Sequence, residues 1–199
     1  MSSAVLIILI HQFIFQGMFF TKNILLSRRL GTPIRGRNRE ANLSIAFFGC
    51  FIALSVLLGS FDAPIGTIEL TSRNVAATIA LALLVVNLLV GAAALIGLRD
   101  SWRVGVLENQ RTDLIETGIY RFSRNPYFLA YLVMFAGYTV LLQSVVLLLL
   151  SILGFAMIHA MVLKEERHLT AQHGDRYRQY LERTPRYIIN LRSHHGRGQ

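Results

Sequence analysis

Long apolar stretches recur along the chain, with short polar segments between them. There are five, at residues 4–20, 43–59, 75–98, 126–142 and 145–163. A helix needs roughly 17 to 25 predominantly apolar residues to cross a bilayer, and each stretch is close to that length or within it. The pattern predicts an all-α integral membrane bundle of about five transmembrane helices.

The last two stretches form a helical hairpin in this interpretation. Only Gln143 and Ser144 separate them, which leaves room for a tight turn. Such a turn brings Asn125-Pro126, at the start of the hairpin, close to Glu165-Glu166, at its end. Polar groups that converge at a membrane face often form a functional site, so we expect one here.

Composition supports a membrane protein with one structural domain. Of the 199 residues, 53% are hydrophobic and only 16% are charged, which is unusual for a soluble domain. We divide the domain into three N-terminal helices at 1–98, a loop, hairpin and tail at 99–190, and a disordered end at 191–199.

Charge predicts the orientation. Basic residues concentrate in the first connection, the third connection and the C-terminal tail, whereas the second connection is poor in them. The positive-inside rule then places the N-terminus outside and the C-terminus in the cytoplasm. The net charge of +9 is spread over these segments without a nucleic-acid-binding module, so we expect membrane lipids as partners and no nucleic acid.

Several site types lack their sequence signatures. The chain has no glycine-rich dinucleotide fingerprint and no phosphate-binding loop with Lys-Ser/Thr. His168 and His173 are five residues apart and fall on different helix faces, so we predict no metal site.

The candidate polar residues also have purely structural interpretations. Asn125 and Pro126 suit the first positions of a helix, although free amides there also attract anions. Glu165-Glu166 is equally compatible with a solvated helix edge. His159 fits either an interhelical hydrogen bond or a catalytic role.

A set of motifs in the second half changes this balance. Gly118-Ile119-Tyr120, Ser123-Arg124-Asn125-Pro126-Tyr127 and Glu165-Glu166 are followed by Gly174, Tyr177 and Tyr180. Together, over residues 99–187, they resemble the isoprenylcysteine carboxyl methyltransferase and phospholipid methyltransferase superfamily, in its bacterial form. The resemblance implies a membrane methyltransferase that uses S-adenosylmethionine, located in a bacterial inner membrane.

The resemblance also implies which residues bind the cofactor. They come from the third connection, the start of the hairpin and the acidic pair: Thr112, Asp113, Leu114, Ile115, Tyr120, Asn125, Pro126, Tyr127, Phe128 and Glu165. The chemistry is reasonable, because a carboxylate can pair with the cofactor's ammonium and tyrosine faces attract its sulfonium.

The acceptor is expected to be a lipophilic molecule with an amine or a carboxylate. An arginine that prenylcysteine enzymes use for their substrate aligns near Met161, which argues against prenylcysteine. Arg121, Arg124 and Arg167 are the alternative substrate-binding residues, and Glu166 is the candidate general base for an amine. An NADPH-dependent membrane reductase of the steroid-reductase type and a non-catalytic scaffold remain alternatives, which cofactor binding would distinguish.

Overall fold

The computed structural model describes residues 2–31, 39–61, 66–102 and 113–187, with side chains omitted at 39–41. In these ranges the regular elements are α1 (Ser3–Leu30), α2 (Arg39–Gly59), α3 (Arg73–Gly97), η1 (Arg99–Ser101), η2 (Gly118–Arg121), α4 (Pro126–Leu142), α5 (Val145–His173) and α6 (Asp175–Arg183). The only β-type contact within the described part is an isolated bridge between Thr67 and Ser144. The predicted all-α bundle is confirmed.

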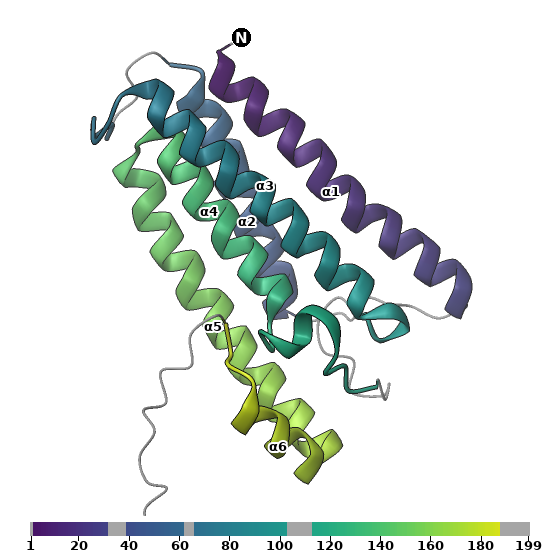
Figure 1. Ribbon diagram of the computed structural model, residues 1–199. Coiled ribbons are helices and arrows are strands. Elements are labelled where there is room, and N and C mark those ends of the chain that lie inside the picture. Colours follow the sequence, from purple (N-terminus) through teal and green to yellow (C-terminus); the bar gives the residue numbers. More distant parts are fainter. Residues whose placement is uncertain (1, 32–38, 62–65, 103–112, 188–199) are drawn as a thin grey trace, which may run out of the picture.

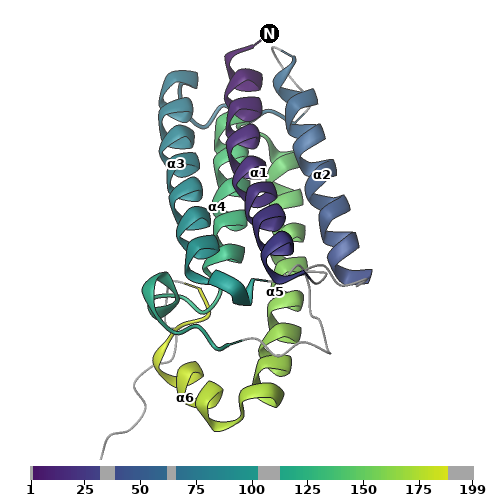
Figure 2. The same ribbon diagram turned by 90° about the vertical axis from the view of Figure 1, so that its right-hand side faces the viewer.

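Four helices are long and apolar enough to cross a membrane, namely α1, α2 from Asn42 onward, α3 and α5. The fifth, α4, has 17 residues and lies inside the bundle beside α3 and α5 (Figures 1 and 2). At about 1.5 Å per residue it is roughly 26 Å long, which is close to the ~30 Å hydrocarbon core. The chain is therefore an integral membrane protein with a helical bundle.

Two helices run further than their apolar stretches. Helix α1 continues to Leu30 and ends at Gly31, whose left-handed backbone (φ 62°) caps it. Helix α5 continues without a break past Leu163 to His173 and ends at Gly174. Helix α6 begins at Asp175, and Gly174 occupies its N-cap position.

The turn between α4 and α5 is fixed by the connection between α2 and α3. Gln143 adopts a left-handed backbone (φ 45°), and its side-chain oxygen accepts hydrogen bonds from the amides of Leu70 and Thr71 at 2.9 and 3.0 Å. Its side-chain nitrogen donates to the Thr71 carbonyl. The turn of the hairpin is therefore held at this end of the bundle. The start of α4 and the end of α5 both lie at the opposite end.

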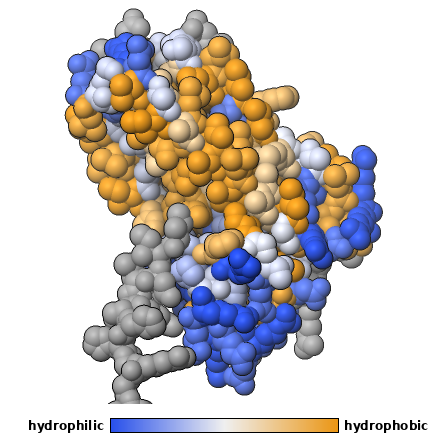
Figure 3. All heavy atoms as spheres, viewed as in Figure 1, coloured by the Kyte–Doolittle hydropathy of each residue, from blue (hydrophilic) through white to orange (hydrophobic). Residues whose placement is uncertain are grey.

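That opposite end, formed by η2, α6 and the extension of α5 from Lys164 to His173, is called the polar end below. Figures 1 and 2 show α5 projecting beyond the bundle and α6 folding back beside it. In Figure 3 hydrophobic residues cover the bundle, whereas hydrophilic residues gather over α6. The polar end thus lies outside the membrane-spanning part.

A hydrogen-bonded cluster joins three helices inside the bundle. His11 of α1 contacts the Tyr138 hydroxyl through Nδ1 and the Asn87 side-chain oxygen through Nε2, both at 2.8 Å. Gln12 also donates to Tyr138, and Asn87 donates to the Ala130 carbonyl. All four cluster side chains are buried. Because unpaired polar groups are costly in lipid, this cluster holds α1 against α3 and α4.

Candidate functional site

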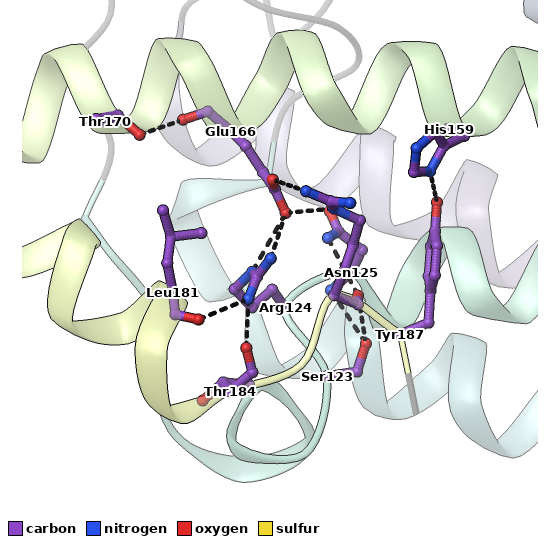
Figure 4. A network of polar contacts seen from close by, with 10 residues as sticks. Ser123, Arg124, Asn125, His159, Glu166, Thr170, Leu181, Thr184 and Tyr187 are labelled. Atoms are coloured by element: carbon purple, nitrogen blue, oxygen red, sulfur yellow. Dashed lines mark hydrogen bonds and ion pairs between the residues drawn. The ribbon is translucent and has the colours of Figure 1, made fainter. Parts of the chain in front are cut away.

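The candidate site is built where the start of the hairpin, the extension of α5 and the tail after α6 meet at the polar end (Figure 4). Its central contact joins the two halves of the hairpin, as the sequence predicts. Arg124, two residues before α4, donates to Glu166 of α5 through Nη2 at 2.8 Å and Nε at 3.2 Å. The tight turn and the antiparallel packing of α4 and α5 therefore bring these positions together.

Glu166 is paired with a second arginine from the tail. Arg186 donates from Nη2 to Glu166 Oε2 at 2.7 Å and from Nε to Oε1 at 3.0 Å. Burial alone would raise the pKa of Glu166, but the hydrogen bonds from Arg186 and Arg124 outweigh it and hold that pKa below its usual range. A carboxylate in this state is a poor proton acceptor at neutral pH. The arrangement argues against the general-base role predicted for Glu166.

The Arg124 guanidinium makes several further hydrogen bonds at the polar end. Besides Glu166, its Nη1 donates to the Leu181 carbonyl at 3.0 Å and to the Thr184 carbonyl. Its side chain is only 9% exposed. A guanidinium with these partners holds the tail in place, so the arrangement argues against its predicted role in binding a substrate.

The tail is tied to the loop before α4 along its backbone as well. The Arg124 amide donates to the Pro185 carbonyl, and both Ser123 Oγ and Asn125 Nδ2 donate to the Arg186 carbonyl, at 3.1 and 3.2 Å. Asn125 does occupy the N-cap position of α4, yet its side chain makes no capping bond. Its amide serves the tail contact instead.

The next tail residue reaches back to the bundle. The Tyr187 hydroxyl lies 3.3 Å from Nδ1 of His159 in α5. His159 thus forms a hydrogen bond, but with the tail and not with another helix as its interhelical interpretation predicts. Ser123, Arg186 and Tyr187 were not predicted as part of the site, because nothing local in the sequence indicates what a coil segment after α6 contacts.

Glu165 differs sharply from its neighbour. It is half-buried and has no hydrogen bond or ion pair with any residue in the described ranges. Burial, followed by the charge of Glu166, raises the pKa of Glu165 to about 7. Successive helical positions lie about 100° apart, so Glu165 faces away from the Arg124 and Arg186 contacts.

Tyrosine rings lie on the side that Glu165 faces. Burial and then the charge of Glu165 raise the pKa of Tyr120, which is buried in η2. Tyr180 of α6 donates its hydroxyl to the Tyr120 carbonyl at 2.5 Å. Leu114 packs with Tyr177 and Tyr180 in a small apolar cluster, and Leu169 of α5 packs against it. A carboxylate without a partner among the described residues, beside an aromatic and apolar wall, is suited to an organic cation.

The remaining predicted cofactor residues are distributed more widely. Pro126 is buried at the start of α4. Tyr127 and Phe128 pack into the bundle, and Tyr127 also contacts the Trp102 ring at 4.7 Å. Asp113 is exposed and Ile115 is half-buried near Leu114. Thr112 lies outside the described residues.

The two other predicted substrate-binding arginines are exposed. The Arg121 guanidinium lies 5.1 Å from the centre of the Phe122 ring. Arg167 lines an open groove of about 380 Å³ between α5 and α6, together with Leu163, Glu166, Thr170 and Leu181. Both cations are available to a ligand at the polar end. Within the described ranges, no group of three or more His, Cys, Asp or Glu side chains is placed to hold a metal ion.

These features define a class: a helical membrane protein whose hairpin ends and tail enclose an acidic pair beside the bilayer. Residues 75–176, about half of the chain, match the sequence model of the phospholipid methyltransferase family, and the chain belongs to that family. The match begins within α3, before the motif-bearing stretch. Helix α3 is also the helix that packs most extensively against α4.

The chain is also similar to the nickel-cobalt-cadmium resistance protein NccN of Alcaligenes xylosoxydans xylosoxydans. The two are 29% identical over 80 residues, which are 40% of this chain and 38% of NccN. The chain thus matches well under half of that relative.

Proposed function

We propose that the protein transfers a methyl group from S-adenosylmethionine to a lipophilic acceptor at the polar end of the bundle. Membership of the phospholipid methyltransferase family supports the reaction class. The observation that carries the proposal is Glu165, a half-buried carboxylate without an ion-pair partner among the described residues, beside Tyr120. A buried acid without a partner is costly, and a cationic ligand would compensate it.

The residues around Glu165 fit this cofactor chemically. The carboxylate suits the ammonium of the methionine part, and the faces of Tyr120 and Tyr177 suit a sulfonium. The apolar cluster of Leu114, Leu169 and Tyr177 offers a surface for uncharged parts of the ligand. When bound, S-adenosylmethionine supplies a methyl group activated by the positive sulfur.

The protein's own contribution would be positioning. Arg124, Glu166 and Arg186 lock the start of the hairpin, α5 and the tail together, so Glu165 is held at a fixed distance from the membrane-spanning part. Methyl transfer is an in-line displacement, which benefits mainly from orientation and exclusion of water. A rigid site next to the bilayer supplies both for an acceptor that enters from the lipid.

The ion pairing of Glu166 bears on the acceptor class. A carboxylate acceptor needs no base, whereas an amine must first lose a proton. Because two guanidinium groups hold Glu166 ionised and engaged, the arrangement favours a carboxylate, with the exposed Arg121 and Arg167 available to an acidic group. Orientation with the polar end in the cytoplasm, predicted from the loop charges, would give the site access to S-adenosylmethionine.

The direct test is calorimetric binding of S-adenosylmethionine to the full chain in nanodiscs, with NADPH as the competing ligand. Glu165→Gln should weaken binding by about 1.5 to 3 kcal/mol, or roughly 10- to 150-fold in Kd, because a charge-assisted hydrogen bond is lost. Glu182→Gln, an exposed position in α6, is the matched control and should bind like the wild type.

Two results would contradict the proposal. If the two variants bind the cofactor with equal affinity, Glu165 is a solvated helix position and not part of the cofactor site. Binding of NADPH without binding of S-adenosylmethionine would favour the reductase alternative. Mass spectrometry of lipids from cells with and without the gene, searching for a gain of one methylene, would identify the acceptor.

A further inference from the structure

Two polar atoms at the polar end are buried without a hydrogen-bond partner in the described part of the chain. They are Oε1 of Gln172 and Nε2 of His173, in the last turn of α5. Buried polar atoms are nearly always paired in native proteins, since an unpaired one costs the desolvation of the group. A buried atom of this kind points to a partner that the described residues do not supply, such as a ligand.

Gln172 lies on the same face of α5 as Glu165. The positions 165, 169 and 172 are spaced by four and three residues, which places their side chains in one row. Leu169, between them, packs against Leu114, Tyr177 and Tyr180. Seven residues correspond to about 10.5 Å along the helix axis. That separation is comparable with the distance between the ammonium and the adenine amine in an extended S-adenosylmethionine molecule.

His173 is directed differently. It follows Gln172 by about 100° around the helix, and the charges of Arg176, Asp113 and Glu116 act on it after burial has lowered its pKa. Its side chain therefore lies beside the row of 165, 169 and 172 and not within it. The row that starts at Glu165 ends at Gln172.

We propose that Gln172 recognises the adenine base of the cofactor, an inference that rests on the proposed function. The amide oxygen would accept a hydrogen bond from the exocyclic amine of adenine, and the amide nitrogen would donate to a ring nitrogen. Glutamine pairs with adenine through such a two-bond contact when proteins read DNA in the major groove. The apolar side chains of Leu169 and Leu114 would contact the ring beside it. Glu165 and Gln172 thus bind opposite ends of one ligand.

This assignment predicts selectivity for adenine over hypoxanthine. Hypoxanthine carries a carbonyl where adenine carries its amine, so the buried oxygen of Gln172 would face another acceptor. The full-length protein in nanodiscs should bind S-adenosylhomocysteine roughly 5- to 150-fold more tightly than S-inosylhomocysteine. Calorimetry measures both dissociation constants without any need for catalysis.

Two variants locate the selectivity. Gln172→Leu should weaken binding of S-adenosylhomocysteine and remove most of the preference over the inosine compound. Gln179→Leu, at an exposed glutamine of α6, is the matched control and should keep the wild-type preference. Equal loss of preference in both variants would overturn the assignment to Gln172.

The wild-type measurement separates this inference from the proposed function. If the wild type binds both compounds equally well, adenine recognition by Gln172 is wrong while the methyltransferase proposal stands. If it binds neither compound nor S-adenosylmethionine, the proposed function itself fails. Because the wild type gives this answer alone, the test holds even if Gln172→Leu does not fold.

Discussion

At the scale of single residues, the two adjacent carboxylates of α5 have divided roles. Glu166 contacts two guanidinium groups and has a lowered pKa, whereas Glu165 has a pKa of about 7 and no described partner. The difference arises from geometry, because neighbouring positions on a helix point about 100° apart. Glu166 therefore joins the hairpin and the tail, and Glu165 is the residue that we propose for ligand binding.

The raised pKa of Glu165 predicts pH-dependent cofactor binding. In the proposed site, the ammonium of the ligand would pair with the ionised carboxylate. Below pH 7, close to the pKa of Glu165, the free protein would first have to release the Glu165 proton. The affinity should fall by about tenfold per pH unit below pH 7 and level off above it. Calorimetry from pH 5.5 to 8 measures this. A pH profile that is unchanged in Glu165→Gln would contradict the assignment.

The ion pair of Arg124 with Glu166 should matter for stability. Both side chains are about nine-tenths buried, at 9% and 10% exposure, so Arg124→Gln leaves a buried charge without one of its partners. Removing one member of a buried pair typically costs about 3 to 5 kcal/mol. Thermal unfolding in detergent measures the loss.

Arg178→Gln is the control for this variant, because its pair with Asp175 is exposed and only three residues distant. Such pairs contribute about 0.5 kcal/mol or less. Similar melting temperatures for the two variants would show that the buried pair does not hold the polar end together.

At the scale of elements, the hairpin depends on a close approach between helices. Gly154 of α5 faces aromatic rings of two other helices. A Cβ at this position would lie 2.6 Å from the Phe135 ring of α4 and 2.9 Å from the Phe47 ring of α2. Small residues allow such contacts in membranes, where packing drives helix association.

Gly154→Ala should therefore lower the melting temperature, even though alanine is the better helix former. Gly49→Ala in α2 is the matched control, since a Cβ there meets nothing within 4 Å. At that site the gain in helix propensity, up to about 1 kcal/mol, should leave stability equal or higher. A rise in melting temperature for both variants would mean that the bundle can shift to accept the methyl group.

At the scale of the whole molecule, the charge distribution predicts the orientation. Single cysteines at exposed positions, introduced into a Cys50→Ala background, test it in intact cells. Glu69→Cys, between α2 and α3, should react with a membrane-impermeant maleimide. Arg178→Cys, in α6, should react only after permeabilisation, because the loop charges predict that the basic end faces the cytoplasm. The reverse pattern would remove the polar end from the compartment that contains S-adenosylmethionine.

Much of this architecture is predictable from the sequence alone. The lengths of the apolar stretches predict the membrane-spanning helices, and the pair Gln143-Ser144 predicts the hairpin turn. Together they predict that the start of the hairpin and the acidic pair converge, which the contact of Arg124 with Glu166 confirms. The ends of helices are less predictable. Helix α1 continues to Leu30, beyond its apolar stretch at 4–20, because polar residues can also extend a helix.

The sequence by itself thus determined the fold class and the convergence of the hairpin ends, because both depend on local hydropathy and turn chemistry. Only the tertiary structure decided which polar groups are paired. Glu166 forms an ion pair with Arg186, which lies in a coil segment 20 residues further along the chain. His11 forms hydrogen bonds with Asn87 and Tyr138 inside the bundle. Such partners depend on how helix faces and loops meet in three dimensions, which residue spacing does not encode.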